Sequence, residues 1–393
     1  MSRALGGLST SLVSPVNINY NNPASYASIR FTTFETALDA QNIWLKQNEA
    51  TQSSGDAGLG YAALAFPLGN KGGLSMGILP FSKMNYDVTE TVDNELLGST
   101  QDYRFIGDGQ THQFYIGSAV KIRFNKKTQL SLGANGAFLF GALTKQVRVN
   151  FPELTNAITT RRLETLNFRG FTWNTGLLLT QVIKENSSFV TIGVTARPKM
   201  ATHAERDIIW DRITESNSQV FIADTLNQTG VVDGDIEVPA LLSFGVSYSN
   251  KNNFLIGADV SFENWGDFRD FGEANTQMVN STKINFGIGF VPSPKNLGRS
   301  FGDYFSRVHY RFGGRYNTGN IVLDGNKISE FAATIGMGLP LRRSSLGSSG
   351  TLNLSFEIGQ RGSIDNNLIR ENFLNTTIGI SLNDVWFIKR KFN

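Results

Sequence analysis

Residues 253–266 show a strict alternation of apolar and polar positions. In an extended chain one face is apolar, formed by Phe254, Ile256, Ala258, Val260 and Phe262. The other face carries the carboxylates of Asp259 and Glu263. A period of two predicts a β-strand with one face in water and one face that must pack against an apolar environment. That environment is either a second sheet or the hydrocarbon of a bilayer around a closed barrel.

The same pattern or a β-rich run recurs along the chain and predicts fourteen strands. They lie near 31–46, 57–68, 72–90, 111–124, 129–149, 168–184, 188–206, 236–249, 253–266, 277–290, 306–318, 327–341, 351–361 and 373–387. Their second faces are polar, with residues such as Asn135, Asn285 and Glu357. We therefore expect Asp259, Glu263 and Glu357 to point into a polar lumen, bonded to arginines or to plug backbone.

The connections between the predicted strands alternate in length. Short turns such as 69–71 and 125–127 follow even-numbered strands, whereas the long segments 91–110, 150–167 and 207–235 follow odd-numbered ones. This asymmetry is typical of outer-membrane barrels, and a soluble stack of two sheets fits the up-and-down order less well. We predict an all-β fold, a 14-stranded antiparallel transmembrane β-barrel over residues 31–393.

Composition agrees with this prediction. The chain has 40 Gly, 29 Phe and only 10 Pro, and no apolar run approaches the ~18–20 residues of a transmembrane helix. The net charge is +3 and the basic residues form no stripe, so the sequence does not indicate nucleic-acid binding. Zero cysteine is compatible with an oxidising periplasmic route. No apolar h-region follows Met1, so we expect a mature chain in the cell outer membrane, its signal peptide already removed.

Residues 1–30 are rich in glycine, asparagine and proline, which prevents regular structure. We predict a compact plug or arm here, with a disordered tail as the alternative.

Three motifs resemble the FadL-type family of outer-membrane long-chain fatty-acid transporters. Ala4-Leu5-Gly6-Gly7 followed by Asn22-Pro23-Ala24 resembles the family's N-terminal hatch. Residues 238–265, from Val238-Pro239-Ala240 to Trp265, are similar to its proline–glycine strand and the next strand, which ends in tryptophan. Residues 307–316 resemble its Arg/Gly/Tyr strand. The resemblance implies that residues 1–30, with Gly6, Gly7, Asn22, Pro23 and Ala24, form a hatch in the lumen.

The resemblance also implies a ligand that leaves sideways beside a kinked third strand. Pro80 and Phe81 are the candidates for that opening, because proline removes a ladder donor and favours a bulge. An ordinary bulge without a passage is the alternative. The family's acidic pair before Asn-Pro-Ala is missing here, and the basic C-terminal tail after Trp386-Phe387 looks more like Bacteroidetes members.

Catalytic and metal chemistry is not indicated. His112, His203 and His309 lie on separate predicted strands without metal-ligand spacing. The cluster of His203 with Glu205 and Asp207 fits a solvated strand end better than a hydrolase site. We expect no enzyme, no metal and no cofactor.

Two functions fit these patterns. The first is passive uptake of hydrophobic, fatty-acid-like compounds through a hatch-gated lumen with a lateral exit. Its candidate lining residues are Leu96, Leu97, Phe151, Leu154, Ile208, Ile209 and Trp210. The second is a non-transporting accessory or scaffold barrel in an outer-membrane secretion or barrel-assembly complex. Expected partners are outer-membrane lipid and lipopolysaccharide, with a hydrophobic small molecule in the first case and complex subunits in the second. A general aqueous porin is disfavoured by the plug.

Overall fold

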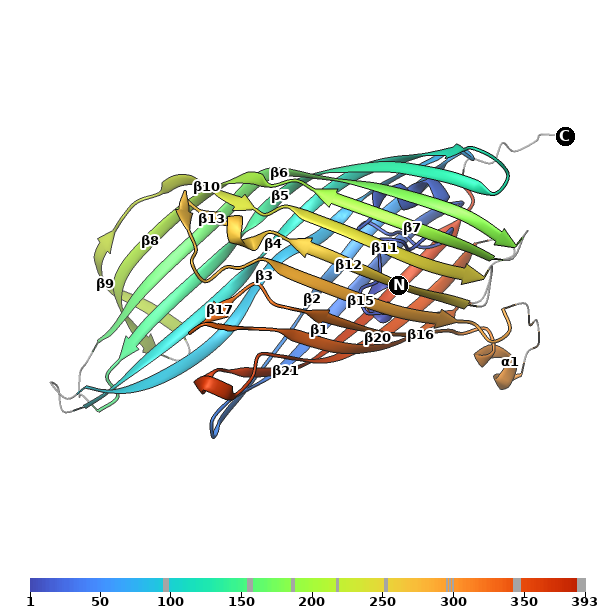
Figure 1. The fold of residues 1–393 in the computed structure, drawn as a ribbon. Coiled ribbons are helices and arrows are strands. Elements are labelled where there is room, and N and C mark those ends of the chain that lie inside the picture. The colour runs from blue at the N-terminus through green and yellow to red at the C-terminus, as the bar shows by residue number, and fades with distance from the viewer. Residues whose placement is uncertain are drawn as a thin grey trace.

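The computed structural model of the chain is a closed antiparallel barrel of 14 strands (Figure 1). It describes residues 1–94, 99–153, 158–184, 188–216, 219–250, 254–294, 296, 298, 300–341 and 348–386. The barrel closes where β1 (Thr32–Gln47) pairs with β21 (Arg370–Asp384), from Thr32↔Asp384 to Lys46↔Arg370. None of the described helices is long and apolar enough to cross a membrane.

Most barrel positions are single strands. They are β1, β2 (Ala50–Leu68), β3 (Gly72–Asn94), β4 (Ser99–Arg123), β5 (Thr128–Asn150), β6 (Thr159–Lys184), β12 (Phe254–Glu263), β15 (Ser281–Phe290), β16 (His309–Asn317), β19 (Glu330–Pro340), β20 (Ser349–Arg361) and β21. The small elements between them are β13 (Arg269–Asp270), β14 (Glu273–Ala274), β17 (Val322–Leu323), β18 (Asn326–Lys327), η3 (Trp265–Asp267), α1 (Phe301–Phe305) and η4 (Asp365–Asn367).

Proline divides the two remaining barrel positions. β7 (Ser188–Arg197) and β8 (Met200–Ser216) both pair with β6 and are separated at Pro198. The next position holds β9 (Gln219–Gln228), β10 (Val232–Val238) and β11 (Leu241–Asn250), with Pro239 between the last two. Proline has no N–H for the ladder, so each strand breaks where it occurs. The sequence predicts single strands near 188–206 and 236–249, and in the structure each is divided at its proline.

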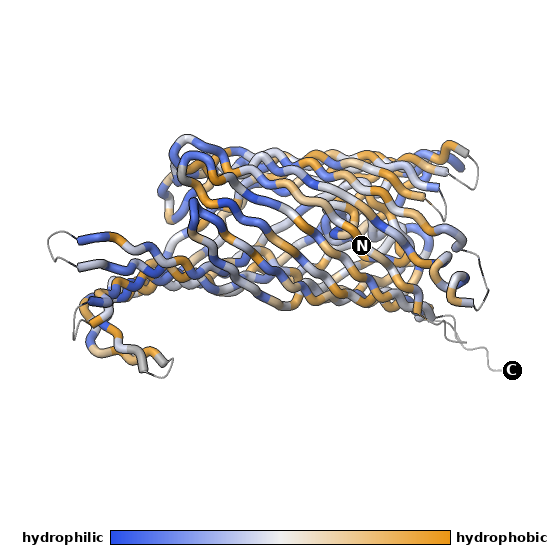
Figure 2. Tube along the Cα trace, turned by 90° about the horizontal axis from the view of Figure 1, so that it is seen from below, coloured by the Kyte–Doolittle hydropathy of each residue, from blue (hydrophilic) through white to orange (hydrophobic). Residues whose placement is uncertain are grey.

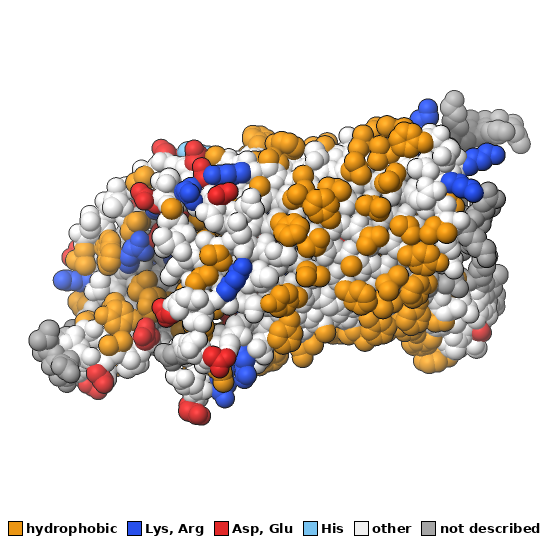
Figure 3. All heavy atoms as spheres, viewed as in Figure 1, with side chains coloured by type: hydrophobic (Ala, Val, Ile, Leu, Met, Phe, Trp, Pro, Cys, Tyr) orange, Lys and Arg blue, Asp and Glu red, His pale blue; other side chains and the backbone are white. Residues whose placement is uncertain are grey.

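The outer surface of the barrel is apolar over a broad band. On β12, Phe254 and Phe262 are exposed, whereas Gly257 and Asp259 are buried on the inner face, as the alternation predicted. The band covers the half of the barrel that contains the short turns, such as 69–71 (Figure 2). Charged side chains gather at the other end (Figure 3). We call these ends the turn end and the loop end.

The three long loops predicted at the loop end are wrong. Residues 99–110 belong to β4 and residues 159–167 to β6, while most of 207–235 belongs to β8, β9 and β10. β2 likewise begins at Ala50 rather than near residue 57. These segments extend beyond the apolar band, where water can solvate both faces of a strand. No apolar face is then required, so the alternation that identifies strands in the band is missing.

Candidate functional site

The N-terminal segment, residues 1–30, lies against the inner wall of the barrel near the turn end. It contains two short 3-10 helices, η1 (Ser2–Leu5) and η2 (Pro23–Ser28). Leu5, Leu8 and Leu12 form a buried cluster in which each is at most 2% exposed. Burial of this kind requires the segment to be packed rather than free in solvent.

Asn22, Pro23 and Ala24 form the cap of η2. The Asn22 side chain accepts a hydrogen bond from the Ala24 N–H at 3.1 Å, and Pro23 starts the helix, where its missing N–H has no cost. The Asn22 amide also donates to the Thr10 carbonyl at 2.6 Å. This tripeptide therefore ties the two halves of the N-terminal segment together.

Asp259 of β12 binds the segment to the wall. Its carboxylate accepts hydrogen bonds from the backbone N–H groups of Ser9 at 2.6 Å and Thr10 at 2.7 Å. Asp259 is 3% exposed, so these bonds to an ionised group are shielded from water. On β19, Thr334 performs a similar role, accepting from the Gly6 N–H at 2.9 Å and donating to the Ala4 carbonyl at 3.2 Å.

A row of glycines on the inner wall lets the backbone of the segment approach the barrel. A Cβ on Gly133 would lie 2.5 Å from the Ala24 nitrogen, and a Cβ on Gly287 would lie 2.6 Å from the Leu5 oxygen. Both distances are closer than real Cβ atoms approach, so only glycine fits. Glycines whose added Cβ would meet the segment occur on nine strands: Gly73, Gly133, Gly176, Gly193, Gly245, Gly257, Gly287, Gly313 and Gly336. We call this set the glycine seat.

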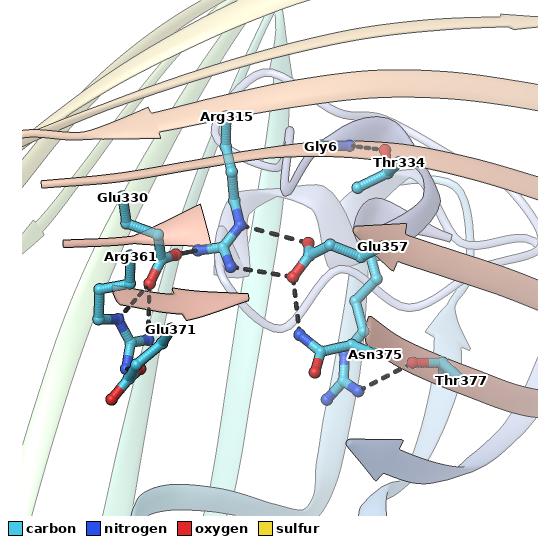
Figure 4. A network of polar contacts seen from close by, with 10 residues as sticks. Gly6, Arg315, Glu330, Thr334, Glu357, Arg361, Glu371, Asn375 and Thr377 are labelled. Atoms are coloured by element: carbon cyan, nitrogen blue, oxygen red, sulfur yellow. Dashed lines mark hydrogen bonds and ion pairs between the residues drawn. The ribbon is translucent and has the colours of Figure 1, made fainter. Parts of the chain in front are cut away.

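An ion-pair network lines the wall beside the seat (Figure 4). Arg315 of β16 binds Glu357 of β20 at 2.9 and 3.2 Å and Glu330 of β19 at 2.6 Å. Arg361 continues the network, contacting Glu330 at 2.6 Å and Glu371 at 3.1 Å. The side chains of Glu330 and Arg315 are 7% and 18% exposed. Four adjacent strands are thus cross-linked on their inner face.

Small cavities lie beside the N-terminal segment in the part of the chain that the structure describes. Two cavities border it, with volumes of about 30 Å³ and 10 Å³. The larger is lined by Tyr20, Tyr61, Arg311 and other residues, and the smaller by Leu12, Ile18 and others. Each has room for roughly one or two water molecules. Neither can hold an acyl chain.

The wall itself is interrupted between β2 and β3. Their ladder runs from Leu68↔Gly72 only to Ala62↔Ile78. Beyond it, β2 stays paired with β1 to Ala50, and β3 stays paired with β4 to Asn94. Residues 50–61 and 79–94 therefore face one another without a described ladder. We call this interruption the seam.

The seam begins beside Pro80. Two residues past the last paired position, Pro80 removes a donor, and a bulge follows that leaves Phe81 without a partner on β4. The Phe81 ring lies 5.9 Å from the guanidinium carbon of Arg197 on β7, so Phe81 points into the lumen. Two side-chain contacts cross the seam: Lys83 pairs with Asp56, and the Gln52 amide donates to the Asp87 carbonyl.

The predicted lining residues that the structure describes do not share one face of the sheet. Leu96, Leu97 and Leu154 lie outside the described residues. Phe151 follows β5 and is half-buried. Ile208 and Trp210 share a face of the sheet with Glu164 and Arg162, which are directly opposite on β6, whereas Ile209 points the other way.

The remaining predicted residues have polar partners. Glu357 belongs to the network described above, and Glu263 accepts from the Trp265 indole N–H. Gly6 and Gly7 have φ of 67° and 88°, so glycine suits the turn after η1. His203 and Glu205 lie near Asp233 of β10 rather than Asp207, with their ligand atoms within 4.8 Å of one another. This group is largely exposed, and we assign no metal to it.

Sequence reasoning missed the glycine seat and the Lys83–Asp56 pair. The luminal positions of the glycines were visible in the alternation. Their partner was not, because it lies between 47 and 332 residues away along the chain, as for Gly73 with Tyr26 and Gly336 with Ala4.

Comparison with known proteins gives two results. The BamG family model matches residues 1–393. Among solved structures, a Pseudomonas aeruginosa FadL homologue is similar with a TM-score of 0.60 and 9% identity, covering 98% of each chain. The Pseudomonas putida toluene transporter TodX has a TM-score of 0.58 and 15% identity, covering 98% of this chain and 97% of TodX. The Ralstonia pickettii toluene transporter TbuX has a TM-score of 0.57 and 13% identity at the same coverage. No curated protein matches.

Proposed function

The chain belongs to the BamG family, and on this premise we propose that it is an accessory barrel subunit of an outer-membrane barrel-assembly complex. Its fold is FadL-like, which agrees with the resemblance inferred from the motifs, while the matching family is BamG. At such low sequence identities, a shared fold does not indicate that this chain binds the same ligand. The turn end would face the periplasm and the loop end the exterior.

The observation that carries the proposal is the seating of the N-terminal segment. A hatch that moves during transport should be held weakly, since mobile elements come from the least stable parts of a fold. Here the segment is fixed by Asp259, Thr334 and the glycine seat, with water-sized cavities beside it. Such a barrel is a rigid body suited to support neighbours.

The polar lining of the seam also favours a structural role. A hydrophobic ligand would have to pass the charged pair Lys83–Asp56, and removing charged groups from water beside an apolar solute costs free energy. A catalytic role has no support in this arrangement, and we propose none.

Affinity purification of the tagged full-length protein from outer membranes in mild detergent tests the proposal. We expect defined outer-membrane subunits to co-purify in fixed ratio and to survive a gel-filtration step. In parallel, cells with and without the protein should take up a fluorescent long-chain fatty acid at the same rate. A monomer that accelerates uptake would refute the proposal.

Passive uptake of hydrophobic compounds is the second candidate, and the seam is the observation that favours it. The ladder ends beside Pro80, where the resemblance implied a lateral exit. Under this alternative the seam would conduct ligand from the lumen into the bilayer. The uptake assay above separates the two functions.

A further inference from the structure

The two sides of the seam are strand edges. β2 over residues 50–61 pairs only with β1 in the described structure, and β3 over residues 79–94 pairs only with β4. A strand offers N–H and C=O groups along both edges. Each side of the seam therefore presents a row of backbone groups with no described ladder partner, and such a row is a template for another strand.

The edges are held apart rather than closed on each other. Pro80 and the bulge at Phe81 turn β3 away from β2, and the long side chains of Lys83 and Gln52 span the space between them. Directly paired strands lie about 4.8 Å apart, a distance that long side chains do not need to bridge. The seam is thus built as a separated pair of edges.

We propose that the seam is the docking site for an extended β-strand of a partner polypeptide, which adds to the edge of β2 or β3. This inference rests on the proposed function and names the mode by which a partner would be bound. Backbone hydrogen bonds would supply most of the affinity in such strand addition.

The charges along the seam indicate the chemistry of that strand. Residues 50–61 and 79–94 carry four carboxylates and one ammonium group: Asp56, Asp87, Glu90, Asp93 and Lys83. Only Asp87 and Asp56 have described cationic partners, Arg104 and Lys83. A strand that bears lysine or arginine would complement this excess of negative charge.

Lipid is a poor occupant of the same place. The seam starts within the apolar band, next to the exposed side chains of Ile78 and Leu59. Within the band, hydrocarbon offers no hydrogen-bonding groups, so it would leave the backbone of both edges unsatisfied there. A polypeptide strand satisfies that backbone and can place alternate side chains beside Leu59 and Val92, which are 41% and 42% exposed.

A cysteine lock tests the proposal, because the chain has no native cysteine. The double variant Asp56→Cys with Lys83→Cys would join the two edges through a bis-maleimide linker that contains a disulfide, since edges bridged only by a lysine side chain are too far apart for a direct disulfide. The control is Ala40→Cys with Ala57→Cys, which joins β2 to its paired neighbour β1 and leaves the seam free. Barrel folding is checked for both variants by heat-modifiable migration on gels.

We expect the linked seam to lower partner recovery at least tenfold, and cleavage of the linker with reductant to restore that recovery. The control link should have no effect. Unchanged recovery with the seam linked would overturn the docking site while leaving the accessory function intact. Absence of any partner for the unmodified protein would instead overturn the proposed function and the inference with it.

A direct measurement complements the lock. A photo-crosslinking amino acid at Thr91, on the β3 edge, should form an adduct with a basic, extended segment of a co-purifying subunit, identified by mass spectrometry. The same amino acid at Thr165, which is paired on both sides with Thr144 and Asp207, should not. Adducts only with lipid, or with a second copy of this chain, would overturn the proposal.

Discussion

Asp259 accepts a hydrogen bond from the backbone N–H of Ser9 at 2.6 Å, across 250 residues of sequence. One luminal carboxylate of β12 thereby fixes the N-terminal segment, since it binds the Thr10 N–H as well. Strands and segment are one packed unit at this point.

Asp259→Asn is expected to loosen the segment. The amide keeps the shape of the side chain but loses the charge that strengthens both hydrogen bonds, a loss of about 1.5–3 kcal/mol. Proteolysis of residues 1–30 from the turn end should accelerate roughly 10- to 100-fold, because each 1.4 kcal/mol or so changes the equilibrium between packed and released segment about tenfold. Asp87→Asn, at an exposed ion pair of β3, is the control. Equal cleavage rates would show that Asp259 does not anchor the segment.

Gly133→Val should displace the segment, whereas Gly136→Val should not. The two glycines are three residues apart on β5, but a Cβ on Gly133 would meet Ala24 and Pro23, and one on Gly136 meets nothing within 4 Å. Valine at Gly133 is therefore expected to increase pore conductance in planar bilayers while the barrel still migrates as a folded species. If Gly136→Val opened the pore equally, the glycine seat would not be the cause.

Arg315→Met is expected to destabilise the barrel. It leaves Glu330 and Glu357, which are 7% and 18% exposed, without their central cation, and breaking a buried pair costs about 3–5 kcal/mol. The transition from folded to unfolded migration on heating should shift to lower temperature. Arg104→Met removes an equally bidentate but exposed partner of Asp87. This variant should lower the free energy of unfolding by only about 0–1 kcal/mol. Similar shifts for both variants would contradict this account.

Deletion of Phe81 combined with Pro80→Val should narrow the seam. The deletion removes the bulge and the substitution restores a ladder donor, so pairing of β2 with β3 can extend past Ala62↔Ile78. A cysteine at Asp56 should then react more slowly with a water-soluble maleimide. A cysteine at Thr165 reports any general change in reactivity. Unchanged labelling at position 56 would mean that Pro80 and Phe81 do not hold the seam open.

The barrel was predictable because its apolar band imposes alternation. Phe254 and Phe262 must face outward and Asp259 inward, and that constraint is visible in residues 253–266 alone. The strand extensions beyond the band were missed for the opposite reason. Residues 99–110 contain Asp102, Arg104 and Asp108 within a run that pairs fully with β5 from Asp102 onward, so no periodic signal marks the strand.

The site was predictable only in part. Pro80 could be identified locally, because its effect on the ladder follows from its own chemistry. Ile208, Ile209 and Trp210 were placed in a loop, whereas they belong to β8 in the structure. The Lys83–Asp56 contact depends on how far β2 and β3 diverge, which no local pattern encodes.

The glycine seat links the packing of the N-terminal segment to the closure of the barrel. The N-terminal segment precedes β1 in the chain yet touches strands from β3 to β19. The full set of these contacts exists only when those strands lie side by side. Packing of the segment and closure of the barrel between β21 and β1 are therefore coupled. In the folded chain, residues 1–30 serve as a core around which the wall of the barrel is wrapped.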